Sequence, residues 1–459
     1  MLSKLLQPEI QSLIAEKKLS ILKEVLNEWS PADIADLLVD LPGHEKVIIF
    51  RLLPNELATD TFEHLEIDTQ MDLLKAMGKS EVADILNEMS PDDRTALLEE
   101  LPGAAAKQLI QLLSSEERKV ALTLLGYPED SVGRLMTPDY IAVKPDWTIE
   151  EALNYIRDNA EDSETLNIVY VINDKGNLLD DIKIREFILA RLDQKVSDLM
   201  DGNYVALNVT DDQETAVNVF KKYDRVALPV VDKNGVLIGI VTVDDVLDVA
   251  EEEATEDIQK LAAVEVLEEP YSTIPIFSMV KKRVVWLTIL FLGETLTAFA
   301  MGHFKDEISK AVVLSMFIPL IISSGGNSGS QASTLVIRAM ALGEIKLKDW
   351  WKIIRREVFS GLSIGIILGA IGFFQVILLS RFIPALNDHL ILISLTVGFS
   401  LIGVVLWGTL LGSTMPFILK SFSVDPATSS GPLMATLVDV TGLIIYFTVA
   451  LTVLGGTLL

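Results

Sequence analysis

Apolar residues are distributed differently in the two halves of the chain. Behind residue 280 the sequence contains long runs with almost no charge, at residues 284–301, 311–337, 358–380, 390–419 and 440–459. A helix needs about 20 residues to cross the hydrocarbon core of a bilayer, and each run approaches or exceeds that length. The pattern therefore predicts five membrane-spanning helices in a domain of residues 276–459.

Before residue 280 the apolar positions fall into short amphipathic segments, and residues 26–43 recur 60 residues later as residues 86–103. Both copies contain Ser-Pro followed by acids. Ser30 and Ser90 can each cap a helix, with proline at its first position. Apolar residues follow at helical spacing, and Leu-Pro-Gly ends each helix. Residues 1–130 are therefore predicted to form an all-α superhelix of stacked hairpins.

A second duplication covers residues 136–249 and has the pattern of strands. Residues 226–231 and 236–241 are short apolar segments joined by Asn234-Gly235, which predicts a hairpin. The region resembles a tandem pair of cystathionine-β-synthase (CBS) domains, at residues 131–197 and 198–250. This resemblance implies an α/β fold.

The same resemblance raises the question of a nucleotide ligand. CBS domains usually bind adenine nucleotides through Thr/Ser-x-x-Asp at a helix start, and Thr242 and Asp245 fit that pattern. The first copy has Ile182-Lys183-Ile184-Arg185 at the equivalent place. ATP is therefore a candidate ligand of the second copy, and the alternative is that Thr242 only caps its helix.

Charge divides the chain in the same way as hydrophobicity. Residues 1–270 carry 25 basic and 56 acidic side chains, whereas residues 271–459 carry 13 and 9. Such an acidic front half repels nucleic acid and attracts cations. The chain has no cysteine, so any metal must be held by oxygen or imidazole. Its first residues also lack the apolar run of a secretory signal.

The helix that begins near Asp244 is predicted to continue towards Pro270 and to connect the two halves, over residues 251–275. Acids recur along one face of it, where like charges repel, and the alternative is a merely solvated face. Mg²⁺ keeps much of its water and binds through one or two carboxylates, which suits a loose acidic interface. The candidate regulatory ligands are Asp245, Asp248, Glu253, Glu256 and Asp257 on this helix, Glu214 and Asp224 in the second CBS copy, and Glu63, Asp92 and Asp93 in the superhelix.

Two polar motifs interrupt the apolar runs. The first, residues 319–331, is rich in glycine and serine, and it places Asn327 and Gln331 on one helical face. Its glycines favour close helix packing, and its amides indicate a wet lining. In the second, Asp439 is the only charged residue after Pro426, and an ionisable residue inside a span is a functional site by default. Glu294 is a weaker candidate, which could instead pair with a hydroxyl at a helix crossing.

Over its whole length the sequence resembles the MgtE family of magnesium channels. The motifs that carry the resemblance are Gly-Gly-Asn-Ser-Gly-Ser-Gln at residues 325–331, Val-Asp-Pro-Ala at residues 424–427 and the segment 435–446. The resemblance implies a homodimer in the bilayer, with Mg²⁺ as substrate and regulator and a pore lined by the second and fifth spans. It also implies that Asp439 and the carbonyl of Ala435 hold hydrated Mg²⁺, and that bound Mg²⁺ clamps the connecting "plug" helix shut. Family members often have Asn at the position of Gly431.

Basic residues before the first span and between the second and third predict a cytoplasmic N-terminus and an outer C-terminus in the cell membrane. An intramembrane hydrolase is disfavoured, because the sequence has no cysteine, four histidines and no HExxH spacing. A CBS-regulated transporter of an anion or organic solute is a further alternative, and the lone acid argues against an anion. Selectivity among Mg²⁺, Mn²⁺ and Co²⁺ stays open.

Overall fold

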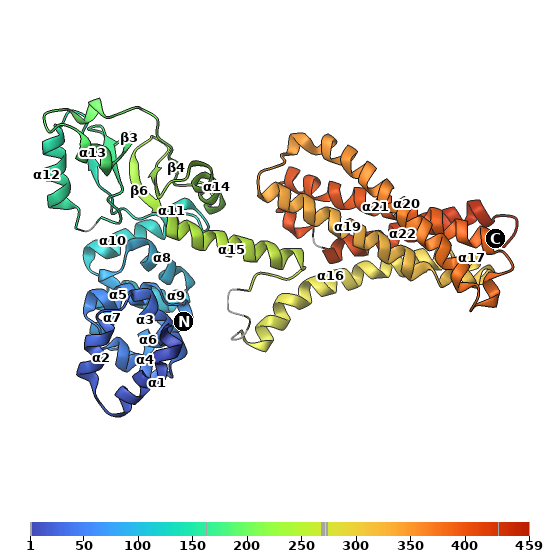
Figure 1. Ribbon diagram of the computed structural model, residues 1–459, viewed down its shortest axis with the longest axis horizontal. Coiled ribbons are helices and arrows are strands. Elements are labelled where there is room, and N and C mark those ends of the chain that lie inside the picture. Colours follow the sequence, from blue (N-terminus) through green and yellow to red (C-terminus); the bar gives the residue numbers. More distant parts are fainter. Residues whose placement is uncertain (1, 162, 268–270, 272–273, 430, 459) are drawn as a thin grey trace. The chain divides into compact units, whose positions relative to one another are not determined.

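The computed structural model describes residues 2–161, 163–267, 271, 274–429 and 431–458. The chain divides into two compact units, Met1–Glu251 and Glu252–Leu459, and each is described by itself (Figure 1). Helix α15 (Val243–Leu261) belongs to both, since the boundary lies within it.

The first part of the N-terminal unit is entirely helical. Its helices are α1 (Leu2–Ala15), α2 (Leu19–Leu26), α3 (Pro31–Asp40), α4 (Gly43–Phe50), α5 (Asn55–Glu63), α6 (Ile67–Ala76), α7 (Lys79–Glu88), α8 (Pro91–Glu100), α9 (Gly103–Ile110) and α10 (Ser115–Leu124). Helices α1, α3, α5 and α7 pack in series, as in a superhelix. The apolar residues spaced at helical intervals, such as Ile34, Leu37 and Leu38, are buried in its core. The predicted all-α N-terminal domain is confirmed.

The two predicted serine caps have different outcomes. The Ser30 hydroxyl accepts a hydrogen bond from the Asp33 N–H at 3.2 Å, as expected of an N-cap. The prediction for Ser90 was wrong, since its hydroxyl donates to the carboxyls of Glu63 and Asp93 instead. The Asp93 N–H, which would donate to a capping Ser90, donates instead to the Asp92 carboxyl at 3.1 Å.

The tandem CBS fold is confirmed. Its elements are α11 (Val132–Leu135), β1 (Ala142–Val143), α12 (Ile149–Asn159), β2 (Ile168–Ile172), β3 (Leu178–Lys183), α13 (Ile184–Leu189), η1 (Val196–Asp198), β4 (Leu207–Asn208), α14 (Gln213–Tyr223), β5 (Ala227–Val231) and β6 (Leu237–Thr242). Each copy has a three-stranded sheet in which a short parallel strand precedes an antiparallel hairpin. Gly235 has a φ of +77°, which the predicted tight turn requires.

The connecting helix is shorter than predicted. Helix α15 ends at Leu261, and Ala263 then has a left-handed φ of +57°. The N–H groups of Ala263 and Val264 donate to the carbonyls of Lys260 and Gln259, which is the Schellman pattern of helix termination. The prediction of a helix as far as Pro270 was therefore wrong, and Pro270 itself lies outside the described residues. The sequence has no glycine or proline at this stop to reveal it.

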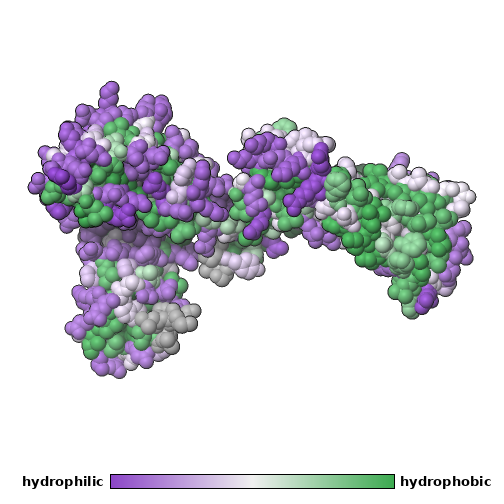
Figure 2. All heavy atoms as spheres, turned by 45° about the horizontal axis from the view of Figure 1, so that its top comes forward, coloured by the Kyte–Doolittle hydropathy of each residue, from purple (hydrophilic) through white to green (hydrophobic). Residues whose placement is uncertain are grey.

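The C-terminal unit contains five helices that are long and apolar enough to span a membrane, as predicted. Its elements are α16 (Ile276–His303), α17 (Lys305–Lys310), α18 (Val312–Ser315), α19 (Ile318–Ala341), η2 (Leu347–Asp349), α20 (Trp350–Leu379), η3 (Pro384–Leu386), α21 (Leu390–Ser421), η4 (Pro426–Thr428) and α22 (Gly431–Leu454). Figure 2 shows hydrophobic side chains over much of the visible surface of these helices, whereas the N-terminal unit shows a mixed and more hydrophilic surface. The first helix starts before the predicted run, because Lys281, Lys282 and Arg283 are included in it.

Glycines bring the membrane helices into close contact. A Cβ atom on Gly412 would lie 2.0 Å from the carbonyl oxygen of Gly329, and one on Gly408 would lie 2.3 Å from that of Gly325. Helices α19 and α21 therefore touch through their backbones, as small residues in membrane helices allow. The packing role predicted for the glycines of residues 319–331 agrees with these contacts.

Candidate cation sites

Acidic side chains from distant parts of the N-terminal unit gather around the first turn of α8. Asp92 is only 7% exposed, and it lies close enough to Asp245 and Glu164 for their charges to act on it. The charges of Asp244 and Asp248, at the start of α15, likewise act on Asp93. The structure thus brings together the helical domain, the first CBS copy and α15.

Burial dominates the electrostatics of this acidic cluster. It raises the pKa of Asp92 well above its ordinary value, and the charge of Asp245 adds to the effect. Burial also raises the pKa of Asp245 to about 7, with Asp244 contributing. The charged forms of these carboxyls are therefore costly in the absence of a cation.

Glu63 belongs to the same region and is tied to α8. Its carboxyl accepts hydrogen bonds from the Ser90 N–H at 2.8 Å and from the Ser90 hydroxyl at 3.3 Å. Burial raises the pKa of Glu63 to about 7, although the Ser90 hydrogen bonds oppose the shift. Glu63 thus fixes the N-terminus of the helix that carries Asp92.

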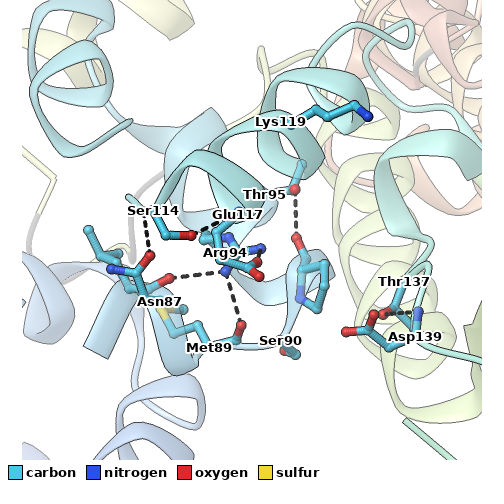
Figure 3. Close-up of polar contacts among 12 residues, drawn as sticks. Asn87, Met89, Ser90, Arg94, Thr95, Ser114, Glu117, Lys119, Thr137 and Asp139 are labelled. Carbon is cyan, nitrogen blue, oxygen red and sulfur yellow. Dashed lines mark hydrogen bonds and ion pairs between the residues drawn. The ribbon is translucent and has the colours of Figure 1, made fainter. Parts of the chain in front are cut away.

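Arg94 holds the other side of α8 in place (Figure 3). Its fully buried guanidinium donates to the carbonyls of Leu86 and Met89, at 3.1 and 3.3 Å, and forms an ion pair with Glu117. This network links α7, α8 and α10 around the acidic turn. A buried arginine is stable only when it is paired in this way.

Thr242 and Asp245 bind each other. The Thr242 hydroxyl donates to the Asp245 carboxyl at 2.6 Å, and the Thr242 N–H donates to the same carboxyl at 3.4 Å. Asp245 thereby caps the start of α15 while its charge acts on Asp92. One residue therefore belongs to both the predicted nucleotide motif and the acidic cluster.

The other predicted acids lie at the ends of α14 and on the second half of α15. Glu214 and Asp224 are exposed at the two ends of α14. On the second half of α15, Glu253 and Asp257 are half-buried, and Glu256 pairs with Lys260. Within the described ranges, no three His, Asp or Glu side chains are arranged to hold one metal ion directly. An ion bound through its own water, as Mg²⁺ often is, does not need such an arrangement.

Lys260 forms a contact that the sequence did not predict. Its ammonium donates to the Asp425 carboxyl at 2.7 Å, and it also pairs with Glu256. Partial burial lowers the pKa of Lys260, but the two acids outweigh burial and raise it. No local pattern could have revealed this pair, because the partners are 165 residues apart.

In the membrane unit, α19 carries both predicted lining residues. Asn327 and Gln331 are exposed in the single chain, whereas Gly325 and Gly329 on the same helix are buried. Ser330 and Ser333 donate to the carbonyls of Gly431 and Ser429, at 3.0 and 2.9 Å. These bonds fix α19 to the start of α22 and leave the amides on a separate face.

Helix α22 carries Asp439 and Ala435. Asp439 is half-buried, and its carboxyl lies close enough to that of Glu294 of α16 for the two groups to interact. Ala435 packs against Gly326 of α19, where a Cβ on the glycine would lie 3.4 Å from the Ala435 Cα. Asp439 is therefore an acid inside a span with another acid as its partner.

Comparison with known proteins agrees with this architecture. The family model of the MgtE divalent cation transporter matches residues 318–449, and that of the MgtE intracellular N domain matches residues 29–130. The CBS domain model matches twice, at residues 132–193 and 196–252. The chain is 36% identical to the magnesium transporter MgtE of Thermus thermophilus over 96% of this chain and 97% of that protein. It is 31% identical to the magnesium transporter MgtE of Bacillus subtilis over 95% of each.

The structure is also similar to a solved cytosolic domain of the Mg²⁺ channel MgtE in complex with ATP, with a TM-score of 0.51 and 36% identity. The match covers 53% of this chain and 99% of the solved domain. The soluble part of a magnesium transporter gives a TM-score of 0.52 at 27% identity, over 55% of this chain and 99% of that one. The chain therefore belongs to the MgtE family of divalent cation transporters.

Proposed function

We propose that this protein is a Mg²⁺-selective channel that mediates magnesium uptake and is closed by cytoplasmic Mg²⁺. The observation that carries the transport function is Asp439, a carboxyl inside the fifth span that is not offset by a basic side chain on α22. Two curated relatives that align over nearly the whole chain are named magnesium transporters. No catalytic family is among the matching family models.

The proposed pore needs two copies of the chain. Asn327 and Gln331 of α19 are exposed in one chain, as expected of residues that face a second subunit or water. In a homodimer with α19 and α22 at the two-fold axis, two Asp439 carboxyls and the Ala435 carbonyls act on one hydrated Mg²⁺. Mg²⁺ loses its water reluctantly, so ligands placed for its hydration shell favour it.

The proposed gate is the acidic cluster. Without Mg²⁺, Asp92, Asp93 and Asp245 repel one another and the N-terminal unit loosens. Bound Mg²⁺ reverses the repulsion, and several weakly bound ions can supply the few kcal/mol that a population shift requires. Closure then reaches the membrane unit through α15, with the N-terminus cytoplasmic and the C-terminus outside.

ATP is a second proposed ligand of the cytoplasmic unit. It is supported by the ATP complex of the similar cytosolic domain and by the Thr242–Asp245 pair. Titration of the purified protein with ATP, compared with Thr242→Val, tests it by calorimetry. Equal affinity in both would exclude this pair as part of a nucleotide site.

Transport is tested in proteoliposomes loaded with a Mg²⁺-sensitive dye. Mg²⁺ uptake should be saturable, should need no added energy source beyond the gradient, and should fall as Mg²⁺ on the cytoplasmic side rises. Competition by Mn²⁺ and Co²⁺ decides between a Mg²⁺-selective channel and a broader divalent cation transporter. No Mg²⁺ uptake by well-folded protein would contradict the proposal.

A further inference from the structure

Helix α16 places one acid directly against the proposed pore site. The helix packs along α22, and a Cβ on Gly293 would lie 2.8 Å from the Thr436 Cγ2. The next residue, Glu294, lies close enough to interact with Asp439, which is about one helical turn beyond Thr436. Two independent contacts thus fix the same register between the two helices.

Packing does not account for a glutamate at this position. None of the described residues of α16 (Ile276–His303) is buried, and its large apolar side chains, such as Phe291 and Leu292, are exposed. Glu294 is the only charged residue between Arg283 and His303. A carboxyl in the apolar part of a span is costly, and such residues face a partner, a cavity or a water-filled path.

No basic side chain on the neighbouring helices is positioned to neutralise the pair. The helices that pack against α22 are α16, α19 and α21. Their other charged or titratable side chains all lie near helix ends: Lys281, Lys282, Arg283 and His303 on α16, Arg338 on α19, and Lys420 on α21. Two carboxyl groups in contact repel when both are ionised, so the arrangement favours a cation between or beside them.

We propose that Glu294 supplies a second carboxylate to the cation site at Asp439, and that this added charge sets the preference for divalent over monovalent cations. Each subunit then presents two acids, from α16 and α22, to one hydrated ion. The inference depends on the proposed function, because it assigns a further residue to the same pore site.

The charge of the ion explains why selectivity should respond. Coulomb attraction to a fixed carboxylate is twice as large for Mg²⁺ as for Na⁺ at equal distance. Removing one carboxylate therefore weakens Mg²⁺ binding more than Na⁺ binding, and the ratio between the two ions falls.

A purely structural role makes a different prediction. If Glu294 only clamps α16 to α22, Gln at position 294 keeps the clamp, because its amide can donate to Asp439. Glu294→Gln therefore removes the charge while keeping a polar group that can contact Asp439. Glu357→Gln is the matched control, since it removes a carboxyl from α20, a helix without extensive packing on α22.

The experiment measures Mg²⁺ uptake by the full chain in proteoliposomes, with and without competing Na⁺. For Glu294→Gln we expect the half-saturating Mg²⁺ concentration to rise about tenfold, equivalent to about 1.4 kcal/mol of binding free energy, and Na⁺ competition to strengthen. Glu357→Gln should match the unmodified protein. Unchanged affinity and unchanged Na⁺ competition in Glu294→Gln would overturn the inference.

A second variant keeps the test decisive if Gln disturbs folding. The chain contains no cysteine, so Glu294→Cys creates a single thiol. A thiolate binds Cd²⁺ strongly, and Cd²⁺ should block Mg²⁺ uptake by Glu294→Cys and not by the unmodified protein. Absence of block would show that position 294 is away from the ion path. Normal uptake by Asp439→Asn would instead refute the proposed function itself.

Discussion

The hydroxyl of Thr242 donates a hydrogen bond of 2.6 Å to the carboxyl of Asp245. The same carboxyl acts electrostatically on buried Asp92 of the helical domain. A capping interaction at the start of α15 therefore holds an acid in a position where it repels another domain. This relationship makes the N-terminal unit sensitive to anything that neutralises its acids.

Protons should stabilise the N-terminal unit. The pKa of Asp245 and that of Glu63 are raised to about 7 in the folded state, above the ordinary carboxyl value, so the folded state binds protons more readily than the unfolded state. The free energy of unfolding should therefore fall as pH rises from about 4 to about 7, and change little from these groups above that range. Circular dichroism of a fragment of residues 1–262 should show a melting temperature that is higher at about pH 5.5 than at about pH 8, without Mg²⁺.

Millimolar Mg²⁺ should reduce this difference by stabilising the fragment mainly at the higher pH. Asp92→Asn is the diagnostic variant, because it removes the most buried acid of the cluster around α8. Its melting temperature should depend less on pH and on Mg²⁺. A melting temperature that increases with pH in the unmodified fragment would contradict the expected direction.

Asp439→Ala should abolish divalent cation transport while leaving the proposed homodimer folded. The change removes two symmetry-related charges from the proposed pore and leaves the backbone of α22 helical. Mg²⁺ uptake in proteoliposomes should fall to the level of empty vesicles, and size-exclusion chromatography should show an unchanged dimer. Near-normal uptake would show that Asp439 is not part of the ion path.

Replacing Asp248, Glu253, Glu256 and Asp257 by Ala should leave conduction intact but weaken its inhibition by cytoplasmic Mg²⁺. These acids lie along α15, and four fewer negative charges reduce the repulsion that Mg²⁺ relieves. A patch-clamp titration of cytoplasmic Mg²⁺ measures the inhibition curve. The matched control replaces Glu24, Glu28, Asp36 and Asp40, four exposed acids of the helical domain, by Ala. Equal curves for the two quadruple variants would mean that the α15 acids are only a solvated face.

Arg94→Ala should destabilise the N-terminal fragment by about 3 kcal/mol, because it breaks a buried ion pair and leaves carbonyls without a donor. Arg51→Ala is the control, since Arg51 and Glu81 form an exposed pair that is worth about 0.5 kcal/mol. Urea denaturation of the fragment measures the loss of stability caused by each substitution. Similar losses for the two variants would show that the Arg94 network does not hold α8.

Gly412→Ala should destabilise the membrane unit by about 1 to 3 kcal/mol, because its methyl group would collide with the Gly329 carbonyl and separate α19 from α21. Gly302→Ala is the control. A Cβ at Gly302 meets nothing within 4 Å, and alanine favours a helix by about 0.5 to 1 kcal/mol. In detergent, the midpoint temperature of thermal unfolding should be lower than that of the unmodified protein only for Gly412→Ala. A loss of stability confined to Gly302→Ala would contradict the packing described.

The sequence revealed those features that depend on local pattern. Uncharged runs identified the five spans, and the Ser30 cap and the Asn234-Gly235 turn followed from residue preferences that act over a few positions. The cap at Ser90 failed because the Asp93 N–H donates to the Asp92 carboxyl, while the Ser90 hydroxyl donates to Glu63, 27 residues away. The contacts of Lys260 with Asp425 and of Glu294 with Asp439 depend on tertiary folding, and no spacing rule connects such distant positions.

The early end of α15 changes how the membrane unit can be controlled. A continuous helix would transmit rotation and thrust to α16 along its backbone, but the left-handed residue Ala263 interrupts that path. The end of α15 is instead joined to the segment before α22 by the ion pair of Lys260 with Asp425. Such a contact can dissociate and reform, and it weakens as ionic strength rises. The coupling of α15 to the membrane unit should therefore depend on the surrounding salt concentration as well as on Mg²⁺.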